Sequence, residues 1–512
     1  MRVFQGIAVK TRVYGERDVR MSRKNQGIWS GPLLSSKINS PNVKPPEMLL
    51  GYLIGPFGAL LASGIFTSQL QNYLTNVLKL DLAFLTALQL FSTILIVAAN
   101  LVVGQLIERT HTLAGKARPW ILLSALTLSV SSVLMFIVPF ESRTARMVWV
   151  AVAYNLYYAV GFPIYNTANS TLVPVSTRNS QQRSALASFT NIASLGVMGV
   201  GSMVFPVLVS MALKEDQGLW FAAMLAVAIF TALTILLQFQ FTRERVTEEN
   251  SGAAGVEAPS VSMSSQLKAV ASEKMWWLVI LFYVSFQWTG AMKNGSMTFF
   301  CQWVLDNSFF TGLGLVENLG DAWGMSQSLL AILGAIPMAL AATVVVPLAN
   351  RFGKRQTAFT GMVVGVAGGV IAGLGGGNIV PVAIGVALKC LGSAPACYLI
   401  LAMLADVIDH IEFTSGIRTD GLTMSVYSAL MVAGTPICNA IFSGILGASG
   451  YDQSADVALN TLGQTAAAQS AISISYIWVE TVGYAVCAVL IFLWTVEKNL
   501  PEEQAAIARR KK

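Results

Sequence analysis

Residues 83–107 read AFLTALQLFSTILIVAANLVVGQLI, a run in which no side chain is charged. At about 1.5 Å of rise per residue, a helix of this length exceeds the roughly 30 Å of hydrocarbon in a bilayer. Helices buried inside soluble proteins rarely stay uncharged over such a distance. The run therefore predicts a membrane-spanning helix.

Apolar runs of similar length recur along the chain, and short polar turns separate them. Hydrophobic residues make up 54% of the chain and charged residues 12%, whereas a soluble domain carries about 25% charged residues. So many uncharged runs do not fit inside one globule, which argues against a large soluble protein. The predicted spans are 50–77, 83–107, 119–139, 147–174, 184–213, 218–241, 275–304, 323–350, 357–375, 379–408, 421–447 and 470–496.

A polar segment rich in Ser, Gly, Ala and Glu divides these spans into two sets of six. We therefore expect an all-α membrane protein with twelve transmembrane helices in two pseudo-symmetric six-helix bundles. The expected parts are a basic cytoplasmic tail that we predict to be disordered at 1–47, an N-terminal bundle at 48–241, a cytoplasmic linker at 242–274, a C-terminal bundle at 275–496 and a cytoplasmic tail at 497–512.

The basic residues indicate which side of the membrane each turn occupies. With both termini and the linker inside, about 27 of the 33 Lys and Arg residues lie on the cytoplasmic side, as the positive-inside rule requires. We therefore predict a multi-pass protein of the cell inner membrane with both termini cytoplasmic. This placement accounts for the net charge of +7 without a nucleic-acid partner. The N-terminal tail is either a plain extension or a patch for anionic membrane lipid, and translation starts at Met1 or at Met21.

Two cytoplasmic turns share one arrangement of residues. Residues 104–120 read GQLIERTHTLAGKARPW after the second span, and residues 347–355 read PLANRFGKR after the eighth. In both, a polar residue beside Arg precedes a Gly that permits a tight turn, and basic residues follow that can pair with a neighbouring helix. A repeat six spans apart is typical of transporters whose halves move against each other.

A longer pattern extends these motifs. It consists of ERT at 108–110 with GKARPW at 115–120, ADVIDHIEFTSGIRTDG at 405–421 and, more weakly, FPIY at 162–165. Together these stretches resemble the glycoside–pentoside–hexuronide:cation symporter family of the major facilitator superfamily. The resemblance implies the major facilitator fold, a sugar, glycoside or hexuronide as small-molecule substrate, and Na⁺ or H⁺ as coupling ion. We expect a gate or structural ion-pair network of Glu108, Arg109, Lys116, Arg118, Arg351, Lys354, Arg355, Asp406, Asp409, Glu412 and Arg418.

The sequence departs from this family at the membrane-embedded charges through which its melibiose carriers bind cation and sugar. The matching positions hold uncharged residues, namely Leu60, Ile96, Asn100, Gly161 and Val432 or Ala433. A Na⁺ site needs several oxygen ligands and preferably a negative charge, which these side chains do not supply. We therefore expect no metal site and transport that does not depend on Na⁺.

Other ionisable residues lie within the predicted spans. Lys293 falls in the seventh span, and Lys389 in the tenth and Glu480 in the twelfth lie roughly 15 Å deep. An ionisable residue near the midplane costs at least about 2.5–3.5 kcal/mol, so each is a functional candidate. By the resemblance both lysines lie on cavity helices, where each either binds an acidic substrate or pairs within the bundle. Glu480 is expected to be a structural partner, and H⁺ coupling, if present, would use Glu480 or Asp406.

Amides and hydroxyls match the OH groups of sugars, and aromatic rings pack against their C–H faces. Such residues gather in the first and fourth predicted spans. The predicted substrate-binding residues are Tyr52, Gln69, Asn72, Asn155, Tyr158, Tyr165, Asn166, Asn169, Lys293 and Lys389.

The sequence shows no catalytic constellation. It has no phosphate-binding loop of the G-x-x-x-x-G-K-[ST] type and no Cys/His cluster. We therefore expect a secondary transporter rather than an enzyme, without a cofactor. Two alternatives stay open: a transporter of a non-sugar organic anion or aromatic compound, and a non-transporting membrane sensor with the same fold.

Overall fold

The chain forms helices joined by turns throughout the residues that the computed structural model describes. These are residues 36–38, 40–110, 112, 114–177, 179–246, 263–417 and 419–510. Residues 1–35 and 39 of the predicted N-terminal tail and residues 247–262 of the predicted linker lie outside the described residues.

Within the described residues, six helical spans form the N-terminal half. Capping residues start several of them, as when Asp81 and Asp216 accept hydrogen bonds from backbone N–H groups of the first turn. The elements are η2 (Glu47–Ile54), α2 (Phe57–Asn72) and η3 (Tyr73–Val77) in the first span, then α3 (Leu82–Glu108), α4 (Arg118–Leu134), α5 (Arg143–Asn155) with η4 (Leu156–Gly161) and α6 (Phe162–Ser176), α7 (Ser180–Leu208) with η5 (Val209–Leu213), and α8 (Gln217–Gln240).

The described residues from 263 onward form six more spans, which make up the C-terminal half. Glu273 and Asn378 cap two of them in the same way. The elements are α10 (Met263–Ser272), α11 (Lys274–Trp303), α12 (Ser308–Gly312), α13 (Leu319–Phe352), α14 (Lys354–Leu374), α15 (Ile379–Ser415), α16 (Asp420–Ala448), η6 (Val457–Leu462), α17 (Ala466–Ser473) with η7 (Ile474–Trp478) and α18 (Val479–Leu493), η8 (Val496–Lys498) and α19 (Leu500–Arg510).

The observed spans lie where the sequence predicted them, which confirms the all-α membrane fold. Within the described residues, 11 helices are long and apolar enough to cross a membrane, and α4 is a shorter apolar helix. The largest difference concerns α15, which passes its predicted end at residue 408 and continues to Ser415. Asp406, Asp409 and Glu412 are part of this helix, and Gly416 ends it with a left-handed φ of 71°.

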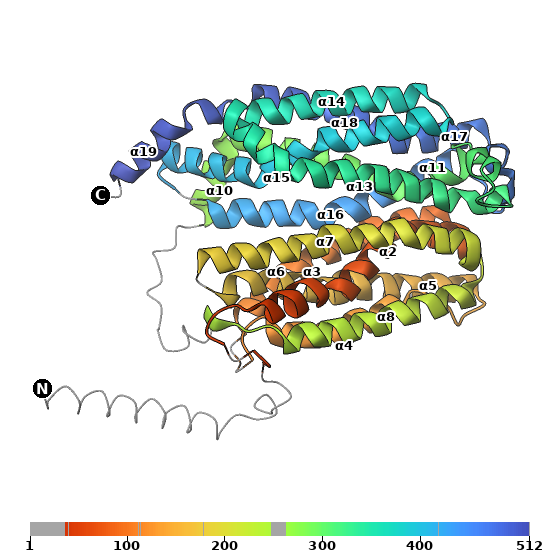
Figure 1. The fold of residues 1–512 in the computed structure, drawn as a ribbon, viewed down its shortest axis with the longest axis horizontal. Coiled ribbons are helices and arrows are strands. Elements are labelled where there is room, and N and C mark those ends of the chain that lie inside the picture. The colour runs from red at the N-terminus through yellow and green to blue at the C-terminus, as the bar shows by residue number, and fades with distance from the viewer. Residues whose placement is uncertain are drawn as a thin grey trace, which may run out of the picture.

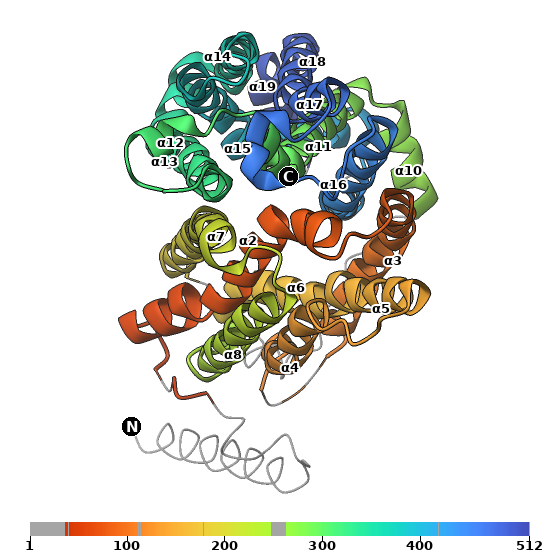
Figure 2. The same cartoon turned by 90° about the vertical axis from the view of Figure 1, so that its right-hand side faces the viewer.

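The two halves lie side by side as separate bundles (Figures 1 and 2). Helix α16 packs against α3, and α13 packs against α7, so each half contributes its second and fifth spans to the contact. Within the C-terminal half, α14 and α15 approach so closely that a methyl group added at Gly368 would lie 2.7 Å from Gly385 O. Small residues permit such close packing of membrane helices.

The bundles have two distinct ends (Figure 1). Residues 242–246, α10 and α19 lie at one end, which we call the linker face. The turns between α2 and α3, between α7 and α8, and between α16 and α17 lie at the opposite end, the distal face. These two names give the positions of the side chains described below.

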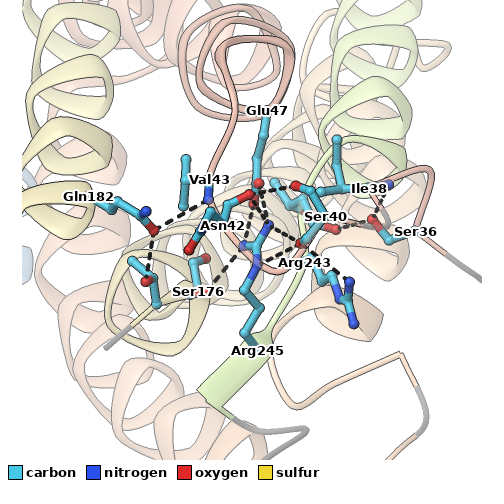
Figure 3. A network of polar contacts seen from close by, with 12 residues as sticks. Ser36, Ile38, Ser40, Asn42, Val43, Glu47, Ser176, Gln182, Arg243 and Arg245 are labelled. Atoms are coloured by element: carbon cyan, nitrogen blue, oxygen red, sulfur yellow. Dashed lines mark hydrogen bonds and ion pairs between the residues drawn. The ribbon is translucent and has the colours of Figure 1, made fainter. Parts of the chain in front are cut away.

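The residues just before the first span are held against the linker face (Figure 3). Arg245 donates hydrogen bonds to both carboxylate oxygens of the buried Glu47, at 2.7 and 3.0 Å. Arg245 also donates to Ser40 O, and Ser36 Oγ donates to Thr242 O at 2.8 Å. These hydrogen bonds attach Ser36, Ser40 and Glu47 to the segment after α8, and disorder of the tail stays a prediction.

The C-terminal tail is also docked. Glu503 in α19 lies 2.9 Å from His410 Nδ1 in α15, and Gln504 Nε2 donates to Asp409 Oδ2 at 2.9 Å. The second ring nitrogen of His410 lies 3.7 Å from Glu273, which precedes α11. His410 thus connects α15 to both the tail and the end of the linker.

Candidate functional site

A cavity of about 300 Å³ lies between the halves. It is bounded by α2 and α7 of the N-terminal half and by α11, α13, α15 and η7 of the C-terminal half. Lys293 is the one charged side chain among the described residues that line it. The other polar lining residues include Thr67, Ser68, Ser194, Ser202, Asn294 and Gln327, and larger apolar ones include Met203, Met297, Leu330 and Met338.

Behind the cavity wall, the Glu480 carboxylate in α18 lies between two ammonium groups. Its Oε1 atom is 3.2 Å from Lys293 Nζ, and its Oε2 atom is 2.5 Å from Lys389 Nζ. Tyr484 Oη donates a hydrogen bond to Glu480 Oε1 at 2.8 Å. Lys389 also donates to Ile477 O at 3.3 Å. The Lys293–Glu480–Lys389 triad therefore holds two cations and one anion, a formal charge of +1.

The two lysines differ in their access to the cavity. The Lys293 side chain is 20% exposed and lines the cavity, whereas that of Lys389 is 3% exposed. Helix α15 presents Val386 and Cys390 to the cavity instead, while Lys389 faces the twelfth span. Lys389 therefore pairs within the bundle, which is one of the two roles expected for it, and a part in substrate binding stays a prediction. Glu480 is a pairing partner, as expected.

Amide side chains close the cavity toward the distal face. Gln69 Nε2 in α2 donates to Thr298 Oγ1 in α11 at 3.3 Å and to Gln327 Oε1 in α13 at 3.1 Å. Thr298 Oγ1 donates in turn to Ser68 O at 2.9 Å. These bonds cross from one half to the other. The Nε2 atom of Gln327 is buried and has no hydrogen-bond partner in the described part of the chain.

A second polar layer lies beyond the first, nearer the distal face. Gln302 Nε2 donates to Asn72 Oδ1 at 3.3 Å, Asn76 Nδ2 donates to Gln302 Oε1 at 3.3 Å, and Tyr451 Oη donates to Asn76 Oδ1 at 2.9 Å. Of the predicted substrate-binding residues, Gln69 and Asn72 thus belong to the two closing layers, and Lys293 lines the cavity.

Apart from Lys389, the other predicted substrate-binding residues stay within the N-terminal half. Tyr165 Oη donates to Gln238 Oε1 at 3.3 Å, and Gln238 Nε2 donates to Asn169 Oδ1 at 2.7 Å. Tyr52 Oη and Ser176 Oγ share a hydrogen bond nearer the linker face. These side chains satisfy one another, as buried polar groups must.

The remaining residues of the fourth span follow the same trend. Asn155 Nδ2 donates to Ala151 O within its own helix, Tyr158 packs against Tyr154, and Asn166 is exposed. Among the described residues that line the cavity, none belongs to α5, η4 or α6. A role in substrate binding for this span stays a prediction.

At the linker face of the N-terminal half, Glu244 caps the N-terminus of α4. Its carboxylate accepts hydrogen bonds from the backbone N–H groups of Lys116, Ala117 and Arg118, each at 2.8 Å. A carboxylate at this position accepts hydrogen bonds from N–H groups that have no partner within the helix. Its negative charge also interacts favourably with the positive end of the helix dipole. The Arg118 side chain turns back to donate to Phe239 O at 2.8 Å.

Glu497 makes the corresponding cap in the C-terminal half. It accepts hydrogen bonds from Lys354 N at 2.6 Å and from Arg355 N at 2.9 Å, at the start of α14. The Arg355 side chain donates to Phe492 O and lies over the Phe492 ring, as Arg118 lies over Phe239. The two halves therefore share the same arrangement, carried by the repeated turn motif.

Our reading of the sequence missed both capping carboxylates, although a signal for them is present. Residues 241–245 read FTRER and residues 494–498 read WTVEK. Both consist of an aromatic residue, Thr, any residue, Glu and a basic residue, directly after the last span of each half. The two stretches therefore repeat at a separation of six spans.

The other predicted gating residues differ in how deeply they are buried. Lys354 Nζ donates to both carboxylate oxygens of the buried Asp406, at 2.6 and 2.8 Å, and so ties the repeated turn to α15. Glu412 is also buried, and Arg418 lies outside the described residues. The exposed group consists of Glu108, Arg109 and Arg351. Their part in gating stays a prediction.

The positions that correspond to the family's cation carboxylates form ordinary helix contacts. Asn100 Nδ2 donates to Ile96 O at 2.8 Å within α3. A methyl group at Gly161 would lie 2.5 Å from Ser131 Oγ, so close packing with α4 leaves no room for a larger side chain there. In the part of the chain that the structure describes, no group of three His, Cys, Asp or Glu side chains is placed to hold a metal ion.

Comparison with known proteins places this geometry in a family. The MFS/sugar transport protein family matches residues 51–498. An isoprimeverose transporter of Lactiplantibacillus pentosus is 29% identical over 483 residues, which cover 92% of this chain and 92% of its own. A glucuronide carrier protein homolog of Escherichia coli (strain K12) is 24% identical over 409 residues, 79% of this chain and 84% of its own.

Solved structures agree at the level of the fold. The nucleoside transporter NupG aligns with a TM-score of 0.60 and 12% identity, over 88% of this chain and 100% of its own. An inward-facing, unoccupied bacterial homolog of the human lysosomal transporter Spinster aligns with a TM-score of 0.59 and 13% identity, over 90% of this chain and 99% of its own.

These findings confirm the resemblance to the glycoside–pentoside–hexuronide:cation symporters. The family and the relatives are transporters, not enzymes. Because the family match extends over nearly all of both helix bundles, this chain belongs to the MFS/sugar transport protein family of multi-pass membrane transporters.

Proposed function

We propose that this protein moves a glycoside or hexuronide across the cell inner membrane by alternating access between residues 48–241 and 275–496. The names of its relatives support the solute class, since they include an isoprimeverose transporter and a glucuronide carrier homolog. The cavity between the halves supports the path, because solute sites of such transporters lie where the repeats meet.

The observation that carries the choice of solute is the presence of Lys293 and Gln327 in this one cavity. A hexuronide presents a carboxylate and several hydroxyl groups. The Lys293 ammonium would bind the carboxylate, and the unpartnered Gln327 amide N–H would bind a sugar oxygen. Of the two lysines for which the sequence left an acidic substrate open, we therefore choose Lys293, because it lines the cavity.

The contacts between the two halves support one particular state of the alternating-access cycle. We place the linker face in the cytoplasm, because the Lys and Arg residues concentrate there. The hydrogen bonds between the halves at Gln69 and Asn76 then close the cavity toward the outside. The chain would accept or release its solute on the cytoplasmic side in this state.

Coupling to Na⁺ is not part of the proposal, because the cation positions hold Leu60, Ile96, Asn100 and Gly161. The two carboxylates considered for H⁺ coupling both have cationic partners. Asp406 pairs with Lys354 at the linker face, whereas Glu480 adjoins the cavity through Lys293. Glu480 is therefore the better candidate of the two.

Uptake into proteoliposomes tests the proposal. We would compare a labelled glucuronide with the matching neutral glucoside, in Na⁺ and in K⁺ at equal ionic strength. Removing one partner of a desolvated charge pair costs about 2–5 kcal/mol. Lys293→Gln should therefore weaken binding of the glucuronide by at least about tenfold. The glucoside should be affected much less, and neither should respond to Na⁺.

Lys268→Gln is the matched control, since it removes an exposed lysine of α10 far from the cavity. Equal loss for glucuronide and glucoside in Lys293→Gln would contradict the proposed role of Lys293. Steep stimulation by Na⁺ would show that a cation site exists elsewhere.

A non-sugar organic anion is the second candidate, because Met203, Met297 and Met338 give the cavity apolar walls. An aromatic carboxylate without hydroxyl groups belongs in the same assay, and its preference over the glucuronide would favour this candidate. Binding without accumulation or exchange would instead indicate a non-transporting sensor.

A further inference from the structure

The charge of the triad bears on how the carrier returns after releasing its solute. Lys293, Lys389 and Glu480 interact electrostatically with one another. The other ionisable groups near them in the described residues are thiols and phenols, such as those of Cys390 and Tyr484. A thiol and a phenol are ordinarily uncharged at neutral pH. Among the described residues, Glu480 therefore supplies the only negative charge at this cluster, and one positive charge is left over.

No other carboxylate of α15 can reach the triad to balance it. Asp406 lies 17 residues after Lys389 in the same helix, which places it roughly 25 Å away along the axis. Its oxygens already accept hydrogen bonds from Lys354. The spare charge must therefore be balanced by water or by a solute in the cavity.

Alternating access requires an intermediate in which the cavity is closed to both sides. Closure removes water from Lys293, and an unbalanced charge in such surroundings is strongly unfavourable. A bound carboxylate removes this penalty, because the triad and the solute together carry no net charge. The loaded carrier therefore crosses this intermediate more easily than the empty one.

We propose that this protein is an anion exchanger, which returns across the membrane with a second organic carboxylate monoanion in place of the one it delivered. The inference rests on the proposed function, since it needs an acidic solute at Lys293. It adds the transport mode and the chemical class of the counter-substrate, namely a carboxylate-bearing sugar acid or a similar monoanion.

The test uses the full chain in proteoliposomes, with equal K⁺ on both sides and valinomycin to hold the membrane potential at zero. The initial uptake of labelled glucuronide is measured into vesicles loaded with unlabelled glucuronide and into vesicles without it. Exchange should exceed net uptake by on the order of a hundredfold, the factor that corresponds to one unbalanced charge in the membrane.

Lys293→Gln leaves the neutral pair of Lys389 and Glu480, so its empty form carries no spare charge. For any solute that this variant still transports, loaded and unloaded vesicles should give nearly equal rates. Lys268→Gln should keep the large ratio of the unaltered protein.

The outcomes separate the two proposals. If the unaltered protein gives net uptake as fast as exchange, the inference is overturned, while the proposed transport of glucuronide stands. No uptake under either condition overturns the proposed function itself. If Lys293→Gln keeps the hundredfold ratio, the charge at Lys293 does not set the transport mode, and the inference fails.

Discussion

The two halves of the molecule share a cap and differ in their interiors. At the linker face, Glu244 and Glu497 hold the starts of α4 and α14 in the same way. Inside the N-terminal half, Gln238 of the sixth span pairs with neutral side chains. Inside the C-terminal half, Glu480 of the twelfth span pairs with two lysines.

This difference shows where the internal repeat is kept and where it is broken. Both halves keep the cap, in which a short turn is held by a carboxylate just after the last span of the same half. They differ in their interiors, where Glu480 pairs with charged side chains and Gln238 pairs with neutral ones. A neutral buried amide costs little when it is hydrogen-bonded, whereas a buried charge depends strongly on its partner.

The largest effect should come from removing the anion of the triad. Glu480→Gln leaves two buried or half-buried ammonium groups without a counter-charge, and loss of one partner of a buried pair costs about 3–5 kcal/mol. We expect the free energy of unfolding of the purified protein in detergent to fall by this amount. The double variant Glu480→Gln/Lys389→Met should recover most of the loss, because it removes the more deeply buried cation.

If Glu480→Gln has the same free energy of unfolding as the unaltered protein, the stability of the C-terminal interior depends on charge no more than that of the N-terminal interior. A double variant as unstable as the single one would show that lost packing, rather than unpaired charge, causes the defect.

The next effect compares the two caps. Gly115 and Gly353 both have positive φ angles, 109° and 90°, where a side chain is strained by about 1–3 kcal/mol. At Gly115 a methyl group would lie within 2.6 Å of all three carboxyl atoms of Glu244, whereas at Gly353 it would lie no closer than 3.1 Å to Glu497. Gly115→Ala should therefore destabilise the protein more than Gly353→Ala.

Thermal unfolding of both variants in the same detergent checks this order. The reverse order would show that the Glu244 carboxylate can move away from an added methyl group at a lower cost than its hydrogen bonds suggest. Equal effects would mean that backbone strain dominates and that contact with the carboxylate adds little.

The smallest effect should come from the neutral interior. Gln238→Leu removes the hydrogen bonds with Asn169 and Tyr165, and a net loss of about 1 kcal/mol is typical of such a change. The measurement is the free energy of unfolding in detergent for Gln238→Leu and for Glu480→Gln. The ratio of the two losses compares the two interiors. A loss for Gln238→Leu as large as that for Glu480→Gln would remove the contrast between the halves.

The sequence by itself determined the spans, the division into two halves and the candidate residue Lys293. Each of these follows from hydropathy along the chain or from the rarity of charge in a membrane span, and both are properties of local sequence. The repeated turn at Gly115 and Gly353 was also visible, because it depends on neighbours in the chain.

Only the tertiary structure decided which charges meet. Lys293, Lys389 and Glu480 come from three spans far apart in sequence, and the rotation and register of packed helices bring them together. The same holds for Glu47 with Arg245 and for Glu244 with the start of α4. Hydropathy states that a helix crosses the membrane but does not state which of its faces meets which neighbour, and the ion pairs depend on that choice.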